Sequence, residues 1–152
     1  MTIFISIALS YITSYYSVML HRFIIFGFLG MLAEIIFGAL KEILRHRDFQ
    51  LIGQTSLWVF PLYGLIAFLF PLLAHRVGEF PWWGRGLIYM MAFSLVQYVS
   101  GWVLDRFGLC PWHFASKYSI NGLVSFLQLP LWFGAGLLVE WSYPYIMAMS
   151  QQ

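Results

Sequence analysis

Long apolar stretches separated by short polar segments dominate the chain. Residues 49–74, 86–104 and 118–139 contain no Asp, Glu, Lys or Arg, and residues 23–40 contain one, Glu34. A helix needs about 20 apolar residues to cross the roughly 30 Å hydrocarbon core of a bilayer. Unpaired backbone groups are costly in lipid and no alternating barrel pattern appears, so the pattern predicts an all-α membrane bundle. The core spans are expected at about residues 22–44, 55–75, 85–106 and 122–147.

The first twenty residues differ from these spans in composition. They hold six Ser or Thr and three Tyr, and no charged side chain. Their weak hydropathy favours a peripheral or tilted helix over residues 1–21, with a fifth span as the alternative. A secretory signal would open on basic residues and close on small ones, so we expect the segment to remain in the mature protein. The chain is then a single transmembrane domain over residues 1–152.

The two halves of the chain share a spaced pattern. Leu-x-Glu-x-x-x-Gly at 32–38 precedes Gly-x-x-Ser-x-x-x-x-Pro-Leu-Tyr at 53–63. Leu-x-Gln-x-x-x-Gly at 95–101 precedes the same second motif, with Trp as its last residue, at 122–132. The matched spacing predicts an internal repeat whose copies are related by an axis along the membrane normal, and chance is the alternative. The copies would occupy residues 22–84 and 85–147.

Composition excludes most soluble classes of protein. Only 9 % of the residues are charged and 61 % are hydrophobic, whereas about a quarter of the residues in soluble domains are charged. The basic residues form no cluster of the kind that binds nucleic acid. Cys110 is the only cysteine, so no intrachain disulfide can form. The four histidines lack the spacing of metal ligands and no nucleotide-binding motif occurs, so we expect neither a metal nor a cofactor.

The distribution of basic residues predicts the orientation. Positive charges concentrate on the cytoplasmic side of membrane proteins. Five basic residues lie on one side of the four expected spans and three on the other, which makes the 41–54 and 107–121 loops cytoplasmic. A bacterial inner membrane is the expected location. The larger set is Lys41, Arg45, Arg47, Arg106 and Lys117, and the smaller is Arg22, Arg76 and Arg85.

Polar side chains fall deep inside three of the expected spans. Glu34 and Gln97 lie near the middle of theirs, and Glu140 lies about two-thirds along the last. A carboxylate at such depth costs about 2.5–3.5 kcal/mol, so it must face the bundle interior and find a partner. Small residues one turn away allow helices to approach each group. The sequence therefore predicts a polar intramembrane site that binds a cation, a proton or a polar head group. The alternative is that these groups only hold helices together.

Two further features carry candidate chemistry. The aromatic loop at 108–122 contains Trp112, His113 and Asn121, which we expect at the mouth of the bundle. His113 is a candidate gate or base, or simply a hydrogen-bonded interfacial group. Pro61 and Pro130 are expected to kink their spans, either to line a cavity or to adapt the shape of a helix.

Several segments together resemble the type IV ABC-transporter family of small multi-pass membrane proteins, which includes the transmembrane protein 229 group. The resemblance covers about residues 22–142 and implies a protein of about four helices, with transport as the activity that the family name suggests. It also marks Tyr63 as a candidate site residue. Two departures are Gln97, where the family usually has Glu, and His113-Phe114, where it usually has an Asp. The segments are Gly27 to Glu34, Gly53 to Gly64, Gln97 to Gly101, Cys110 to Gly122 and Trp132 to Glu140.

The leading hypothesis is a membrane transport component, either a carrier, a channel or a subunit of a larger transporter. At 17.7 kDa the chain is small for a complete carrier, so we expect a homo-oligomer or a larger membrane complex surrounded by lipid. The candidate substrate-binding residues are Glu34, Tyr63, Gln97, Trp112, His113, Asn121 and Glu140. A scaffold without chemistry and a lipid-binding or lipid-modifying enzyme remain alternatives, and no catalytic residue is assigned.

Overall fold

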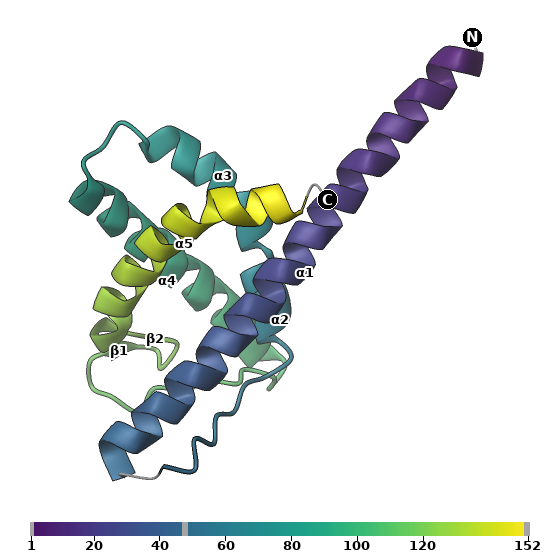
Figure 1. Cartoon of the computed structure of the whole chain (residues 1–152). Helices are drawn as coiled ribbons and strands as arrows, with labels where there is room; N and C mark the ends of the chain where they lie inside the picture. The colour runs from purple at the N-terminus through teal and green to yellow at the C-terminus, as the bar shows by residue number, and fades with distance from the viewer. Residues whose placement is uncertain (1, 47–48, 151–152) are drawn as a thin grey trace. The chain divides into compact units, whose positions relative to one another are not determined.

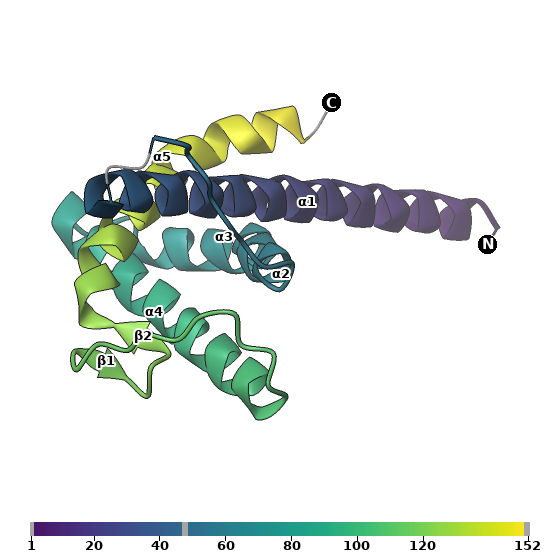
Figure 2. The ribbon, with the colours of Figure 1, turned by 90° about the horizontal axis from the view of Figure 1, so that it is seen from below.

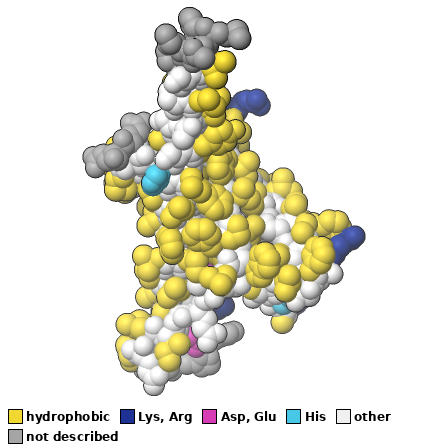
Figure 3. Space-filling view, turned by 90° about the vertical axis from the view of Figure 1, so that its right-hand side faces the viewer, with side chains coloured by type: hydrophobic (Ala, Val, Ile, Leu, Met, Phe, Trp, Pro, Cys, Tyr) yellow, Lys and Arg dark blue, Asp and Glu magenta, His cyan; other side chains and the backbone are white. Residues whose placement is uncertain are grey.

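A computed structural model describes residues 2–46 and 49–150, and helices dominate it (Figure 1). Three helical segments within the described residues are long and apolar enough to cross a membrane: Leu9–Leu44, Val59–Val77 and Trp82–Arg106. Within an apolar stretch of 18 residues in each segment, only 22 %, 22 % and 17 % is buried within the chain. Hydrophobic side chains accordingly predominate on the face shown in Figure 3. The outward apolar surface is suited to lipid, which confirms the expected all-α membrane fold.

Helix α1 runs without interruption from Thr2 to His46. The sequence predicted a boundary near residue 21 between a peripheral helix and the first core span. No boundary forms there because the first proline of the chain is Pro61 and the first glycine is Gly27. Because no residue there interrupts the helical backbone hydrogen bonds, the segment before residue 22 extends the same helix.

Helices α2 (Val59–Gly64) and α3 (Ile66–Val77) together form the second apolar segment. Pro61 was expected to kink this span, but it is the third residue of α2, where its missing N–H would have no helical partner in any case. Pro130 takes the second position of α5 for the same reason. The helix interiors instead contain Pro71 in α3 and Pro144 in α5.

Helix α4 (Trp82–Arg106) begins after Pro81 and ends in a Schellman motif. The N–H of Leu109 donates to the Leu104 carbonyl at 2.9 Å, and Gly108 has the positive φ of 66° that this motif requires. Its limits lie close to those of the span expected at 85–106.

A hairpin and a 3-10 turn, η1 (Phe126–Gln128), stand between α4 and α5 (Leu129–Met149). The strands β1 (Ser119–Ile120) and β2 (Val124–Ser125) are antiparallel, with Asn121 and Gly122 both at positive φ. Figure 2 shows the loop and hairpin running back beside α4. The span expected to start at 122 therefore begins as a helix only at Leu129. The α5 helix is also not among the three apolar segments long and hydrophobic enough to span.

The chain divides into two compact units. The first contains residues 1–71 and 145–152, and the second contains residues 72–144. Helices α1 and α2 pack together in the first, and α4, the hairpin and most of α5 form the second.

Candidate functional sites

Glu34 lies on α1 with two hydroxyl donors around its carboxylate. Thr55 Oγ1 donates to Oε2 at 2.9 Å and Tyr63 Oη donates to Oε1 at 3.4 Å. All three side chains are half-buried. Among the described residues, no Lys or Arg forms an ion pair with Glu34. The carboxylate is thus stabilised by hydrogen bonds and not by a fixed positive charge.

Glycines allow the returning chain to approach this face of α1. A Cβ at Gly30 would overlap the Tyr63 side chain, and a Cβ at Gly27 would lie 2.6 Å from the Phe60 ring. Gly53 packs just as closely on the Ile35 carbonyl. Only a side chain reduced to hydrogen fits at these positions, so the small residues bring Tyr63 within reach of Glu34.

Gln97 forms a comparable cluster in the second unit. Trp132 Nε1 donates to Gln97 Oε1 at 2.9 Å, and Gln97 Nε2 donates to Gln128 Oε1 at 3.3 Å. An indole N–H only donates, so the amide oxygen must face Trp132 and the amide nitrogen must face Gln128. Both ends of the Gln97 amide are therefore used, and the group carries no charge.

Glu140 lies on α5 and pairs with a cation. Its Oε1 is 3.1 Å from Arg85 Nη1, and the two side chains are 25 % and 29 % exposed. The hydroxyl of fully buried Tyr89 is within electrostatic reach of both charges. The sequence placed Arg85 at the start of the span expected at 85–106, and it occupies the fourth position of α4. Its pairing with Glu140 depends on tertiary packing that the sequence pattern does not reveal.

Helices α4 and α5 cross in the view of Figure 1, and side chains four residues apart on α4 contact residues in the reverse order on α5 and, at Gln128, on η1. At Gly136 the helices approach so closely that an added Cβ would overlap Tyr89. Longer side chains bridge the helices on either side of this point. The pairs are Arg85–Glu140, Tyr89–Gly136, Phe93–Trp132 and Gln97–Gln128.

The three loop candidates contact the last three turns of α4. His113 Nε2 lies 3.5 Å from Asp105 Oδ1, with both side chains more than half exposed. Asn121 Nδ2 donates to Tyr98 Oη at 3.0 Å. The Trp112 indole lies against Gly101, and its buried N–H has no hydrogen-bond partner among the described residues. The exposed contact between His113 and Asp105 adds little to stability.

The predicted site residues therefore belong to several local clusters. Arg85 and Gln97 are twelve residues apart on α4, which separates the Glu140 and Gln97 clusters by roughly 18 Å along the helix. Glu34 and Tyr63 lie in the other unit. Sequence reasoning missed the hydrogen-bond partners Thr55 and Gln128, which carried no motif of their own. Within the described residues, no three His, Cys, Asp or Glu side chains gather as metal ligands.

Apolar helices with polar groups on their packed faces define an integral membrane protein. Residues 21–152 match the family described as putative ABC-transporter type IV, and the chain belongs to that family. It is thus a membrane protein of a transport-related family, as the resemblance implied. No solved structure matches it.

Proposed function

We propose that the chain is a small membrane transport component in which the Glu34 carboxylate binds a transported proton or cation. The observation that carries this proposal is the environment of Glu34. Its oxygens accept from the Thr55 and Tyr63 hydroxyls, and no described cationic side chain neutralises it. A carboxylate within an apolar helix and without a fixed counter-charge can take up and release a mobile one.

The other two intramembrane candidates serve this function differently. Glu140 is already neutralised by Arg85, and the Gln97 amide has no charge to exchange. We assign both to polar contacts that hold α4 to α5 and to the η1 turn within the second unit. Trp112, His113 and Asn121, on the loop and hairpin beside α4, are assigned to the end of the helix bundle in the second unit.

The predicted repeat is part of the proposal, and the corresponding contacts support it. Glu34 contacts Tyr63, and Gln97, 63 residues later, contacts Trp132, which is 69 residues after Tyr63. Ser56 and Ser125, also 69 residues apart, each accept a hydrogen bond from the backbone N–H two residues ahead. Because Glu34 in the first copy corresponds to Gln97 in the second, the pair of copies would contain one exchangeable carboxylate at this position. Assembly as a homo-oligomer in a bacterial inner membrane completes the proposal.

Proton flux into vesicles tests this function. The purified chain is reconstituted into liposomes containing a trapped pH-sensitive dye, and a potassium diffusion potential drives protons inward. Wild type is expected to acidify the lumen faster than protein-free liposomes, and Glu34→Gln is expected to reduce the rate to that background. The matched control is Glu42→Gln, which removes the same charge from an exposed position of the same helix.

Two results would contradict the proposal. Undiminished flux in Glu34→Gln would exclude Glu34 as the exchanging group. Absence of flux from wild type, together with a homogeneous oligomer that retains no ligand in native mass spectrometry, would favour a scaffold in which the polar groups only join helices.

A further inference from the structure

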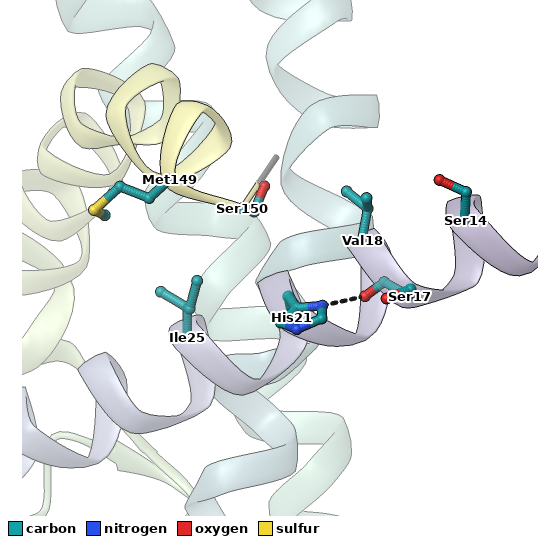
Figure 4. Close-up of a pocket in the computed structure, with 7 residues that line it drawn as sticks. All are labelled: Ser14, Ser17, Val18, His21, Ile25, Met149 and Ser150. Carbon is teal, nitrogen blue, oxygen red and sulfur yellow. Dashed lines mark hydrogen bonds between the residues drawn. The ribbon is translucent and has the colours of Figure 1, made fainter. Parts of the chain in front are cut away.

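A cleft in the first unit lies between α1 and the residues at the end of α5 (Figure 4). Its volume is about 290 Å³, near the lower limit for pockets that hold a small molecule. Its polar lining comprises Ser14, Ser17 and His21 on α1 and Ser150 beyond α5. The first three follow the helical spacing of three and four residues, so they share one face of α1.

A buried positive charge, that of Arg22, is hydrogen-bonded to the lining residue Ser150 without itself lining the cleft. Arg22 is 6 % exposed, and its Nε donates to Ser150 Oγ at 3.0 Å. Ser150 Oγ in turn donates to the Met147 carbonyl at 2.9 Å, which fixes its orientation. A guanidinium remains charged at all physiological pH values. No described Asp or Glu forms an ion pair with Arg22, so the charge calls for an anion from outside the described chain.

The histidine adds a second polar group at the cleft. His21 Nδ1 lies 2.7 Å from the Ser17 carbonyl, as the dashed line in Figure 4 marks. A carbonyl can only accept, so Nδ1 carries the hydrogen and Nε2 is the nitrogen available for other partners. With its hydrogen on Nδ1, the neutral ring offers only an acceptor at Nε2, so the donors available to phosphate oxygens are the Ser14 and Ser17 hydroxyls and the nearby Arg22 guanidinium.

The remaining lining is apolar. Val18 and Ile25 on α1 and Met149 near the end of α5 complete the cleft. These side chains flank the polar group and would contact a hydrocarbon part of the ligand.

We propose that this cleft binds the phosphate group of an anionic phospholipid, with Arg22 supplying the counter-charge and the apolar residues contacting the glycerol and proximal acyl carbons. The site is independent of the proposed transport role of Glu34. Arg22 and Glu34 lie twelve residues apart on α1, which is about 18 Å along the helix. A free phosphate shares the same donor chemistry, and the test below separates the two sources.

Native mass spectrometry of the delipidated full-length chain measures the affinity directly. The probes are dioleoyl phosphatidylglycerol, dioleoylglycerol, which lacks the phosphate, and inorganic phosphate. Wild type is expected to bind phosphatidylglycerol at least about tenfold more tightly than dioleoylglycerol, as loss of a charge-assisted contact implies. Arg22→Gln is expected to remove this preference. The matched control, Arg76→Gln at an exposed position, is expected to keep it.

A second variant covers the case in which Arg22→Gln does not fold. Ser17→Leu fills the cleft from an exposed position and leaves Arg22 and its bond to Ser150 in place. It is expected to weaken phosphatidylglycerol binding about tenfold. Equal binding by wild type and Ser17→Leu would overturn the proposal, as would an equal loss in Arg76→Gln. Inorganic phosphate that binds alone as tightly as the lipid would overturn the lipid assignment.

Discussion

Gly136 and Gly134 provide a matched test of how closely α4 and α5 approach. Both lie on α5, two residues apart. A Cβ at Gly136 would overlap Tyr89, whereas a Cβ at Gly134 would meet nothing within 4 Å. The same substitution to Ala should therefore change the free energy of unfolding differently at the two positions.

The magnitudes follow from two opposing terms. Replacing Gly by Ala within a helix gains about 0.8–1 kcal/mol through backbone entropy and propensity. At Gly134 this gain stands alone, so Gly134→Ala is expected to stabilise the protein. At Gly136 the overlap with Tyr89 forces the helices apart at a cost of about 1–3 kcal/mol, which offsets or exceeds the gain. The variants should differ by about 1–3 kcal/mol.

Reversible unfolding of the detergent-solubilised chain, followed by tryptophan fluorescence, measures this difference. Circular dichroism of each variant checks that helix content is unchanged before unfolding. Equal shifts for Gly134→Ala and Gly136→Ala would refute the reasoning, because Tyr89 would then not be in contact with α5 at this position.

Two further predictions concern the second unit. Arg85→Met leaves the three-quarters-buried Glu140 without its cation and should cost about 1–3 kcal/mol, whereas the double variant Arg85→Met with Glu140→Met should recover most of that loss. Additive effects of the two single variants in the same unfolding assay would show that the pair is not coupled. Gly122→Ala places a side chain at φ +70° and should cost about 1–2 kcal/mol. Faster amide exchange at Phe114, whose N–H donates to the Gly122 carbonyl, reports this cost, and Gly78→Ala should leave that rate unchanged.

The sequence predicted the apolar helices and the packed faces of two of them more accurately than their connections. Gly30 and Glu34, one turn apart, do share the face of α1 that contacts Tyr63. Helical periodicity was enough for this result, because residues four apart necessarily point the same way. The chain between Asn121 and Leu129 was instead read as loop and helix. Asn-Gly at 121–122 is a strong hairpin signal that the hydropathy pattern concealed.

The candidate site was less predictable because it depends on contacts between distant residues. Neither the spacing of Arg85 nor that of Gln128 indicates which side chain it will meet on the neighbouring helix. Arg85 reaches Glu140 only because α4 and α5 cross with Tyr89 against Gly136. Hydropathy also treats all polar residues within a span alike, and so it could not separate a neutralised acid from Glu34, which has hydroxyl partners alone.

The unbroken course of α1 has a geometric consequence. Forty-five residues at 1.5 Å each give a rod of about 68 Å, more than twice the roughly 30 Å thickness of the bilayer hydrocarbon. Even at a tilt of about 40° the rod would extend some 52 Å along the membrane normal. At least one end must therefore project well past the acyl chains. Tyr11, Tyr15 and Tyr16 on its N-terminal part are 77 %, 55 % and 68 % exposed, a belt of aromatic rings that can anchor the rod at the aqueous boundary.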